Sequence, residues 1–239
     1  MAFDSTRPIY DRTVRLLGEE PVKKLAEASV MLFGLGGVGG YILEALCRAG
    51  IGTLILVDCD TVNATNMNRQ VLATRDTVGM QKTDAALLRV RAVNECAEVF
   101  TVNEFVTAAN AAEIIDRFPA PSFIADAIDN VAAKTALIAA AKERNIPIIS
   151  CMGTGNKTDP SKLKISDIFK TDTCPLARAM RLSLKKAGVA KCPVLWSSEL
   201  PRGNTENENG RNVPGSISTV PACAGIMIAA HIINSITEQ

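Results

Sequence analysis

Short apolar runs alternate with segments of helical periodicity through the first 150 residues. Ser29–Phe33, which ends at a glycine, predicts a central strand, and Thr53–Val57 predicts a second strand after a helix at Val38–Ala49. Such a strand–helix–strand unit predicts parallel pairing. The alternation continues through further helices and strands, which we expect at Gln81–Asn94, Val99–Val102, Asn110–Arg117, Phe123–Ala127, Ala132–Arg144 and Pro147–Cys151.

This alternation favours an α/β fold with a Rossmann-like, doubly wound, mainly parallel sheet. Residues 8–28 look helical, and Pro21 is expected to divide them into two helices. Past Cys151 the pattern changes, which predicts a Rossmann-like core over residues 1–155 and a small C-terminal lobe over residues 156–239, packed on that core.

The C-terminal lobe shows a different order of elements. Short strands at Leu163–Ile165 and Val194–Ser197 flank a helix at Leu176–Lys186. The polar stretch Pro201–Pro214 predicts a mobile loop. The apolar run Val220–Ile236 predicts a buried or interface helix that ends the chain.

Composition narrows the class of protein. The 239 residues are 47% hydrophobic but only 4% aromatic, which favours an aliphatic core. The seven cysteines form no CxxC pair, which argues against a disulfide framework and a four-cysteine zinc site and favours a reduced cytoplasm. The first residues have no signal-peptide pattern. Pro221, Gly225 and His231 interrupt the last apolar run, so we expect no membrane span.

Positive charge gathers in one part of a nearly neutral chain. The net charge is +1, yet Lys157–Lys191 holds nine Lys and Arg against three Asp. This surplus indicates either a solvated helix face or a patch that receives RNA phosphates.

A glycine-rich turn follows the first strand and precedes a helix. Gly34, Gly36 and Gly39 match GxGxxG, with Gly37 among them, and such a turn lets the backbone approach a phosphate at a helix N-terminus. Asp58, after the second strand, can accept hydrogen bonds from ribose or can cap its own turn. These features predict a nucleotide site without choosing between NAD and ATP.

Cations beyond the ribose-binding acid favour ATP. Arg69 and Lys82 can neutralise a triphosphate, and Lys82 stands in a first helical turn, where the helix dipole disfavours a cation unless an anion is present. Asp129, after another strand, is a candidate ligand of the Mg²⁺ that accompanies ATP. Asn130 can serve the same site or cap the next helix. A nucleotide sensor or an NAD-binding module is the alternative class.

The segments GLGGVGG, DCDTVNATNMNRQ, VGMQKTDA and DAIDN resemble the ThiF-like, ubiquitin-activating-enzyme-like adenylating family over nearly the whole chain. The resemblance implies that Asp58 contacts ribose, that Arg69 and Lys82 contact phosphates and that Asp129 binds Mg²⁺. It also implies a homodimer in which Arg12 reaches the partner's triphosphate. The implied catalytic residues are Arg12, Arg69, Lys82 and Asp129. The implied nucleotide-binding residues are Gly34, Gly36, Gly37, Gly39, Asp58, Asp60, Asn66, Asn68, Arg69, Gln70, Lys82, Asp129 and Asn130.

Within that family, ISCMGTGNKTDPSKLKISDIFKTDTCPLARAMR and PGSISTVPACAGIMIA are similar to the tRNA threonylcarbamoyladenosine dehydratase branch. This implies adenylation of a carboxylate on tRNA, with a sulfur-transfer protein as a further candidate partner. The alternative is adenylation of the C-terminal Gly-Gly of a small sulfur-carrier protein. Neither Cys174 nor Cys223 is needed as a nucleophile, and we expect His231 to be a packed residue.

Overall fold

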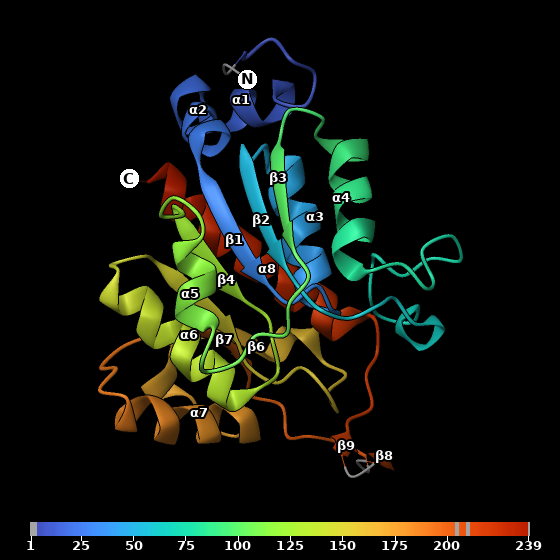
Figure 1. Ribbon diagram of the computed structural model, residues 1–239, viewed down its shortest axis with the longest axis vertical. Helices are drawn as coiled ribbons and strands as arrows, with labels where there is room; N and C mark the ends of the chain where they lie inside the picture. Colours follow the sequence, from blue (N-terminus) through green and yellow to red (C-terminus); the bar gives the residue numbers. More distant parts are fainter. Residues whose placement is uncertain (1–3, 204–205, 209–210, 239) are drawn as a thin grey trace.

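A seven-stranded sheet of order β3-β2-β1-β4-β5-β7-β6 forms the centre of the computed structural model (Figure 1), which describes residues 4–203, 206–208 and 211–238. Neighbouring strands pair in parallel, except that β6 is antiparallel to β7. The strands are β1 (Ser29–Phe33), β2 (Thr53–Val57), β3 (Glu98–Val102), β4 (Phe123–Asp126), β5 (Ile148–Cys151), β6 (Leu163–Asp167) and β7 (Pro193–Ser197).

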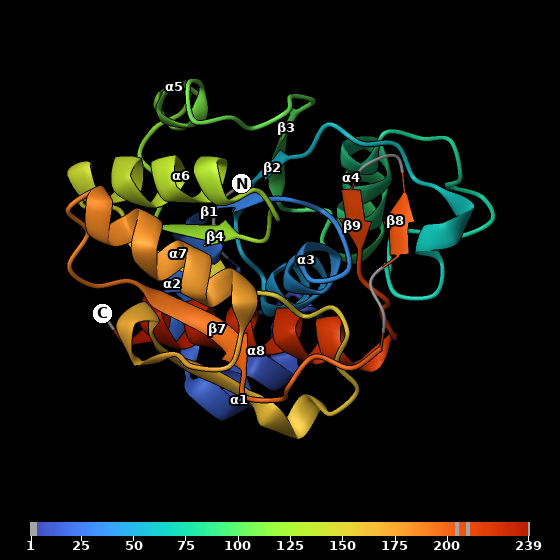
Figure 2. The same cartoon turned by 90° about the horizontal axis from the view of Figure 1, so that it is seen from below.

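Helices cover both faces of this sheet. Figure 2 shows α5, α6 and α7 on one side of the strands and α3 and α8 on the other. The α-helices are α1 (Asp11–Leu17), α2 (Glu19–Glu27), α3 (Gly39–Ala49), α4 (Lys82–Val93), α5 (Ala111–Asp116), α6 (Val131–Glu143), α7 (Pro175–Lys186) and α8 (Thr219–Thr237). Short 3-10 turns are η1 (Ala64–Asn66), η2 (Pro160–Lys162) and η3 (Ile168–Lys170).

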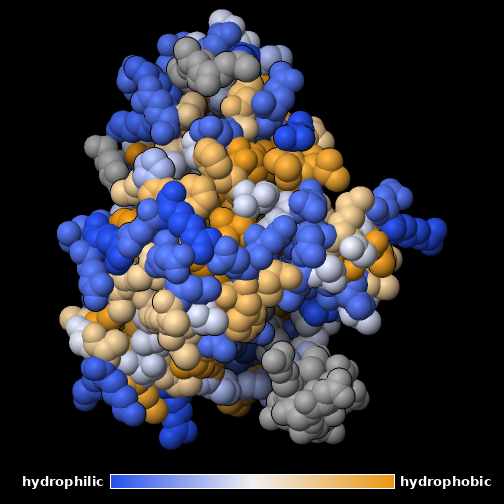
Figure 3. All heavy atoms as spheres, viewed as in Figure 1, coloured by the Kyte–Doolittle hydropathy of each residue, from blue (hydrophilic) through white to orange (hydrophobic). Residues whose placement is uncertain are grey.

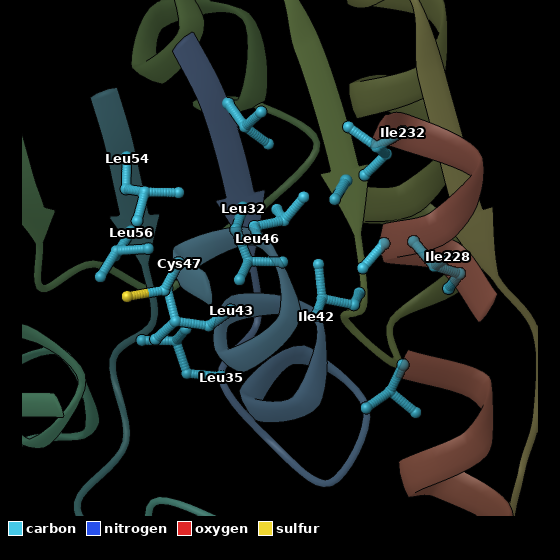
Figure 4. Packing of buried hydrophobic residues seen from close by; sticks show 14 of the residues in the cluster. Leu32, Leu35, Ile42, Leu43, Leu46, Cys47, Leu54, Leu56, Ile228 and Ile232 are labelled. Carbon is cyan, nitrogen blue, oxygen red and sulfur yellow. The ribbon is translucent and has the colours of Figure 1, made fainter. Parts of the chain in front are cut away.

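Alternation along the strands divides the aliphatic core into two layers. In β1, Val30 and Leu32 join the layer under α3, α4 and α8, whereas Met31 and Phe33 join the layer under α5, α6 and α7. Successive side chains of a strand point to opposite faces, so a strand with helices on both sides must be apolar throughout. Figure 4 shows the first layer, in which α3 and α8 pack side by side.

A glycine sets the close contact between α3 and α8. A Cβ at Gly225 would stand 2.5 Å from the carbonyl oxygen of Val38 and 2.7 Å from Cβ of Tyr41. By length and composition, α8 could cross a membrane. Here its buried side, which includes Ile228 and Ile232, is part of the core, so we interpret α8 as a core helix.

The predicted α/β class and the mainly parallel sheet are confirmed, and every predicted strand and helix of the core is present within one or two residues. The helical stretch before β1 breaks at Gly18 and not at the predicted Pro21. Gly18 adopts φ 89°, which glycine tolerates, while Pro21 lies in the first turn of α2, where backbone N–H groups lack helical partners anyway.

The C-terminal part shares the sheet of the N-terminal part. Strand β7 pairs with β5, and β6 pairs with β7, so the proposed division at residue 155 marks no break in the hydrogen-bonded sheet. The predicted loop 201–214 contains an antiparallel pair, β8 (Glu206–Glu208) and β9 (Arg211–Val213). The parts of that prediction that fall on residues 204–205 and 209–210 lie outside the described residues.

Replacing Gly225 with Ala should lower the free energy of unfolding by about 1–3 kcal/mol, because the added methyl group must separate α8 from α3. Urea unfolding followed by circular dichroism measures this loss. Cys223→Ala, exposed on the same helix, is the matched control and should change stability by less than about 0.5 kcal/mol. Equal stability of the two variants would contradict the close packing of these helices.

Candidate nucleotide-binding site

The glycine-rich turn meets the end of β4 where the order of the sheet reverses. Strand β1 lies between β2 and β4, and ligands of doubly wound sheets bind at such a switch point, beyond the carboxyl ends of the strands. Gly34 adopts φ +87°, and a Cβ there would stand 2.8 Å from the carbonyl oxygen of Ala127. Only glycine fits, and a cavity of about 280 Å³ opens beside it.

Asp58 connects the glycine-rich turn to the end of β2. Its carboxylate accepts a hydrogen bond from the backbone N–H of Leu35 at 2.6 Å and another from Asp60 at 2.8 Å. Asp58 therefore has the turn-capping role that the sequence left open, and it also lines the cavity. A carboxylate has about four lone-pair positions, so ribose hydroxyls can still donate to it.

Lys82 projects into the same cavity from the start of α4. Its ammonium lies 2.6 Å from a carboxylate oxygen of Asp60 and 3.8 Å from Asp58. These two carboxylates offset the unfavourable dipole at the helix N-terminus, so the position of Lys82 is explained within the chain itself. A bound phosphate would share this cation with Asp60.

A buried ion pair holds the loop that follows β4. Asp126 and Lys134 are both fully buried, and the Lys134 ammonium lies 2.9 Å from the Asp126 carboxylate. Lys134 also donates to the carbonyl of Ile128 at 3.0 Å, while Asp126 accepts from Ser150 at 2.6 Å and from the N–H of Ile128 at 3.2 Å. Both ions are therefore satisfied by partners that fix the backbone next to the cavity.

Asp129 and Asn130 stand at the rim formed by this loop. The Asn130 side chain accepts a hydrogen bond from the N–H of Ala133 at 3.0 Å and caps α6, which confirms the capping alternative. The Asp129 carboxylate is exposed and accepts no hydrogen bond or ion pair from the residues that the structure describes. It is therefore free to bind a cation.

The remaining predicted residues flank the glycine-rich turn outside the cavity lining. Arg69 packs on Gly37 and donates to the carbonyl of Thr65 at 3.1 Å and to Asn68 at 2.9 Å. A Cβ at Gly39 would stand 1.7 Å from the carbonyl oxygen of Gly34, so that glycine closes the turn.

Three further predicted side chains support this side of the turn. Asn66 takes part in the capping box of η1. The Asn68 amide donates to the carbonyl of Ser216 at 3.1 Å, and the buried Gln70 amide lies over Gly36.

Arg12 lies far from this cavity within one chain. It belongs to α1, at the end of the sheet where β1 begins (Figure 1), whereas the cavity lies where β1 ends. Its side chain is 90% exposed, and its guanidinium lies 4.0 Å from the Asp11 carboxylate.

Sequence reasoning missed the segment that follows β3. Glu104, Phe105 and Val106 line the cavity because β3 is the neighbour of β2 in the sheet. The available signal was their position directly after a predicted strand, at the edge where parallel strands bind ligands.

A second, adjoining cavity of about 530 Å³ shares Ala127, Ile128 and Asp129 with the first. Cys151 and Cys174 line it, and both are buried. Burial raises the pKa of the Cys151 thiol to about 12, so little thiolate exists at neutral pH and this cysteine is a poor nucleophile.

The other two side chains singled out from the sequence lie on α8. Cys223 is exposed and lines neither of these two cavities. His231 packs edge-on against Phe123 with ring centroids 6.1 Å apart, and burial lowers its pKa, as expected of a packed histidine.

Replacing Lys134 with Met should destabilise the fold by about 3–5 kcal/mol, because the Asp126 carboxylate would be left buried without its partner. Chemical unfolding measures the loss. The exposed Lys142→Met on the same helix should change stability by less than about 0.5 kcal/mol. The double variant Asp126→Asn with Lys134→Met should recover part of the loss, and a single variant as stable as the control would refute the argument.

Comparison with known proteins shows the family to which the chain belongs. The chain is 35% identical to tRNA threonylcarbamoyladenosine dehydratase of Bacillus subtilis (strain 168), over 96% of this chain and 95% of the relative. It is 40% identical to the protein of that name from Escherichia coli (strain K12), over 79% and 70%. The crystal structure of the E. coli tRNA N6-threonylcarbamoyladenosine dehydratase in complex with ATP superposes with a TM-score of 0.89 at 33% identity and covers 100% of this chain and 97% of that chain. The model of the ThiF family matches residues 10–239, and the chain belongs to the ThiF family.

Proposed function

We propose that this chain is an ATP-dependent tRNA threonylcarbamoyladenosine dehydratase, which adenylates the carboxylate of the threonylcarbamoyl group on tRNA and allows it to cyclise. The observation that carries the proposal is the 35% identity to the B. subtilis dehydratase over 96% of this chain. Two further observations support it: the E. coli dehydratase of the same fold holds ATP, and Asp58, Lys82 and Asp129 line one cavity here.

The roles proposed for the cavity residues follow from their chemistry. Gly34 and Gly36 let the backbone approach phosphate, and the free lone pairs of Asp58 suit ribose hydroxyls. Lys82 and the remaining guanidinium donors of Arg69 supply positive charge for the phosphates. This set supports ATP over NAD, because a dinucleotide has no terminal triphosphate to neutralise.

Asp129 fits the proposed Mg²⁺. Its carboxylate has no partner among the described residues and borders both cavities, and Mg²⁺ prefers one or two carboxylates together with phosphate and water. Bound there, the ion would neutralise phosphate charge.

The reaction needs positioning and charge neutralisation more than a side-chain nucleophile. A carboxylate oxygen attacks the α-phosphorus, the bond from that phosphorus to the bridging oxygen breaks, and pyrophosphate leaves. A neighbouring group of the substrate then attacks the activated carbonyl, and AMP departs with the former carboxylate oxygen, so one water is lost overall. Lys82 and Arg69 would hold the phosphates in place during the first step.

A homodimer would complete the proposed site. Arg12 lies at the opposite end of its own sheet with an exposed side chain, so it can approach a triphosphate only in another copy of the chain. We infer a cytoplasmic enzyme, which the absence of disulfides among the seven cysteines supports. The sulfur-transfer partner stays a prediction. A sulfur-carrier substrate has weaker support, since the molybdopterin-synthase adenylyltransferase of Haemophilus influenzae matches only 60% of this chain.

One face of α7 supports tRNA as the substrate. Arg178, Lys185 and Lys186 are exposed at helical spacing, on a helix whose first residue, Pro175, lines the second cavity. Hydrophilic side chains project at the end of the molecule where Figure 1 places α7 (Figure 3). Exposed cations on one helix face can position the phosphates of a large RNA.

The defining experiment incubates the protein with threonylcarbamoylated tRNA, ATP and Mg²⁺. We expect one AMP and one pyrophosphate for each modified nucleoside, which loses the mass of one water. Asp129→Asn should lower kcat/KM by about 100-fold or more, while the exposed Asp76→Asn should match the wild type. Pyrophosphate exchange that responds to a small carrier protein but not to modified tRNA would overturn the proposal.

Removing the charge of the α7 face should weaken tRNA binding. The triple variant Arg178→Ala, Lys185→Ala, Lys186→Ala should raise the Kd for tRNA by about tenfold or more at low salt and flatten its salt dependence. The KM for ATP should not change. The control is a second triple variant, in which three cations exposed elsewhere are replaced by Ala and the same charge is removed: Lys23, Lys24 and Arg91. Equal effects of both would indicate a general charge effect and refute this face as the RNA contact.

A further inference from the structure

The second cavity contains a buried cation that the roles assigned so far do not use. Lys157 lies in the loop that follows β5 and is only 3% exposed. It lines the cavity together with Asp129, which also borders the nucleotide cavity. A group held by Lys157 therefore lies next to the proposed ATP site, on the other side of lining residues that the two cavities share.

Within the described residues, the Lys157 ammonium has one partner, the carbonyl oxygen of Gly153 at 2.5 Å. No carboxylate of the residues that the structure describes lies within 4.0 Å of this ammonium. Glu199, an acid that contacts the same loop, accepts hydrogen bonds from the backbone N–H groups of Thr158 and Asp159 and pairs with Arg202 at 3.1 Å.

Two buried lysines, Lys134 and Lys157, differ in the partners that compensate their charge. Lys134 has a carboxylate partner at 2.9 Å and a carbonyl at 3.0 Å, which compensate its charge. Lys157 is nearly as buried, and among the described residues two of its three N–H donors have no acceptor. A buried ammonium without a counterion is costly, and an anion in the adjoining cavity would remove that cost.

We propose that Lys157 binds the carboxylate that is to be adenylated, an inference that rests on the proposed function. One carboxylate oxygen would pair with the ammonium, and the other would face the α-phosphate of ATP across the shared wall at Asp129. When that second oxygen bonds to phosphorus and pyrophosphate leaves, the acyl group loses its negative charge. The ion pair with Lys157 then ends, which frees the activated carbonyl for ring closure.

The test compares Lys157→Met with the wild type on threonylcarbamoylated tRNA. We expect kcat/KM for tRNA to fall by about 10- to 100-fold, mostly through a higher KM, because a hydrogen bond to a charged group is lost. The KM for ATP should change less than twofold. Lys157→Arg, which keeps the charge, should recover part of the activity, and the exposed Lys142→Met should match the wild type.

A binding measurement without turnover tests whether Lys157 recognises the carboxylate itself. With a non-cleavable ATP analogue present, the wild type should bind carboxylate-bearing tRNA about tenfold or more tightly than tRNA whose carboxylate is a primary amide. Lys157→Met should bind both forms equally. Its melting temperature should not fall, since an apolar side chain replaces an uncompensated buried cation.

The outcomes separate the two proposals. A wild type that releases no AMP with modified tRNA overturns the proposed function and this inference with it. A wild type that turns over, next to a Lys157→Met variant with unchanged kcat/KM or undiminished preference for the carboxylate, overturns the role of Lys157 alone. A variant that loses ATP binding and melts early would assign Lys157 a structural role instead.

Discussion

The buried pair of Asp126 and Lys134 is the interaction on which the site depends. It joins the end of β4 to α6 and binds both the N–H and the carbonyl of Ile128, so it fixes the loop that presents Asp129. The same loop supplies the Ala127 carbonyl against which Gly34 packs. The Asp126–Lys134 ion pair therefore stabilises the glycine-rich turn, the rim of the cavity and the wall between the two cavities.

Three buried lysines come after the strands β2, β4 and β5, and the partners of each lysine indicate its role. Lys134 is neutralised by Asp126 and is structural. Lys82 is held by Asp60 and Asp58 at the cavity, where a phosphate can share it. Among the described residues, the Lys157 ammonium donates only to the carbonyl of Gly153. Because the electrostatic energy of a buried charge depends on its partners, the same residue type serves the fold at one strand end and is available to a ligand at another.

Sequence patterns predicted the elements of the core almost to the residue, since each strand had to be apolar on both faces. They failed where local and tertiary effects compete. Pro21 suggested a break that the freedom of Gly18 supplied three residues earlier, and the polar composition of residues 201–214 concealed two short strands. The sequence did not predict that residues 104–106 line the cavity, because only the order of the sheet brings the end of β3 to it.

The sequence by itself determined the α/β class, the turn of Gly34 to Gly39 and the chemical types around it, because periodicity and glycine spacing are local properties. Only the tertiary structure decided which side chains meet. It paired Lys82 with Asp60, assigned Asn130 to the helix cap and left Arg12 at the opposite end of the sheet. It also buried Lys157 beside a cavity, with no counterion in the described part of the chain. Burial and pairing depend on contacts between distant segments, which no local pattern encodes.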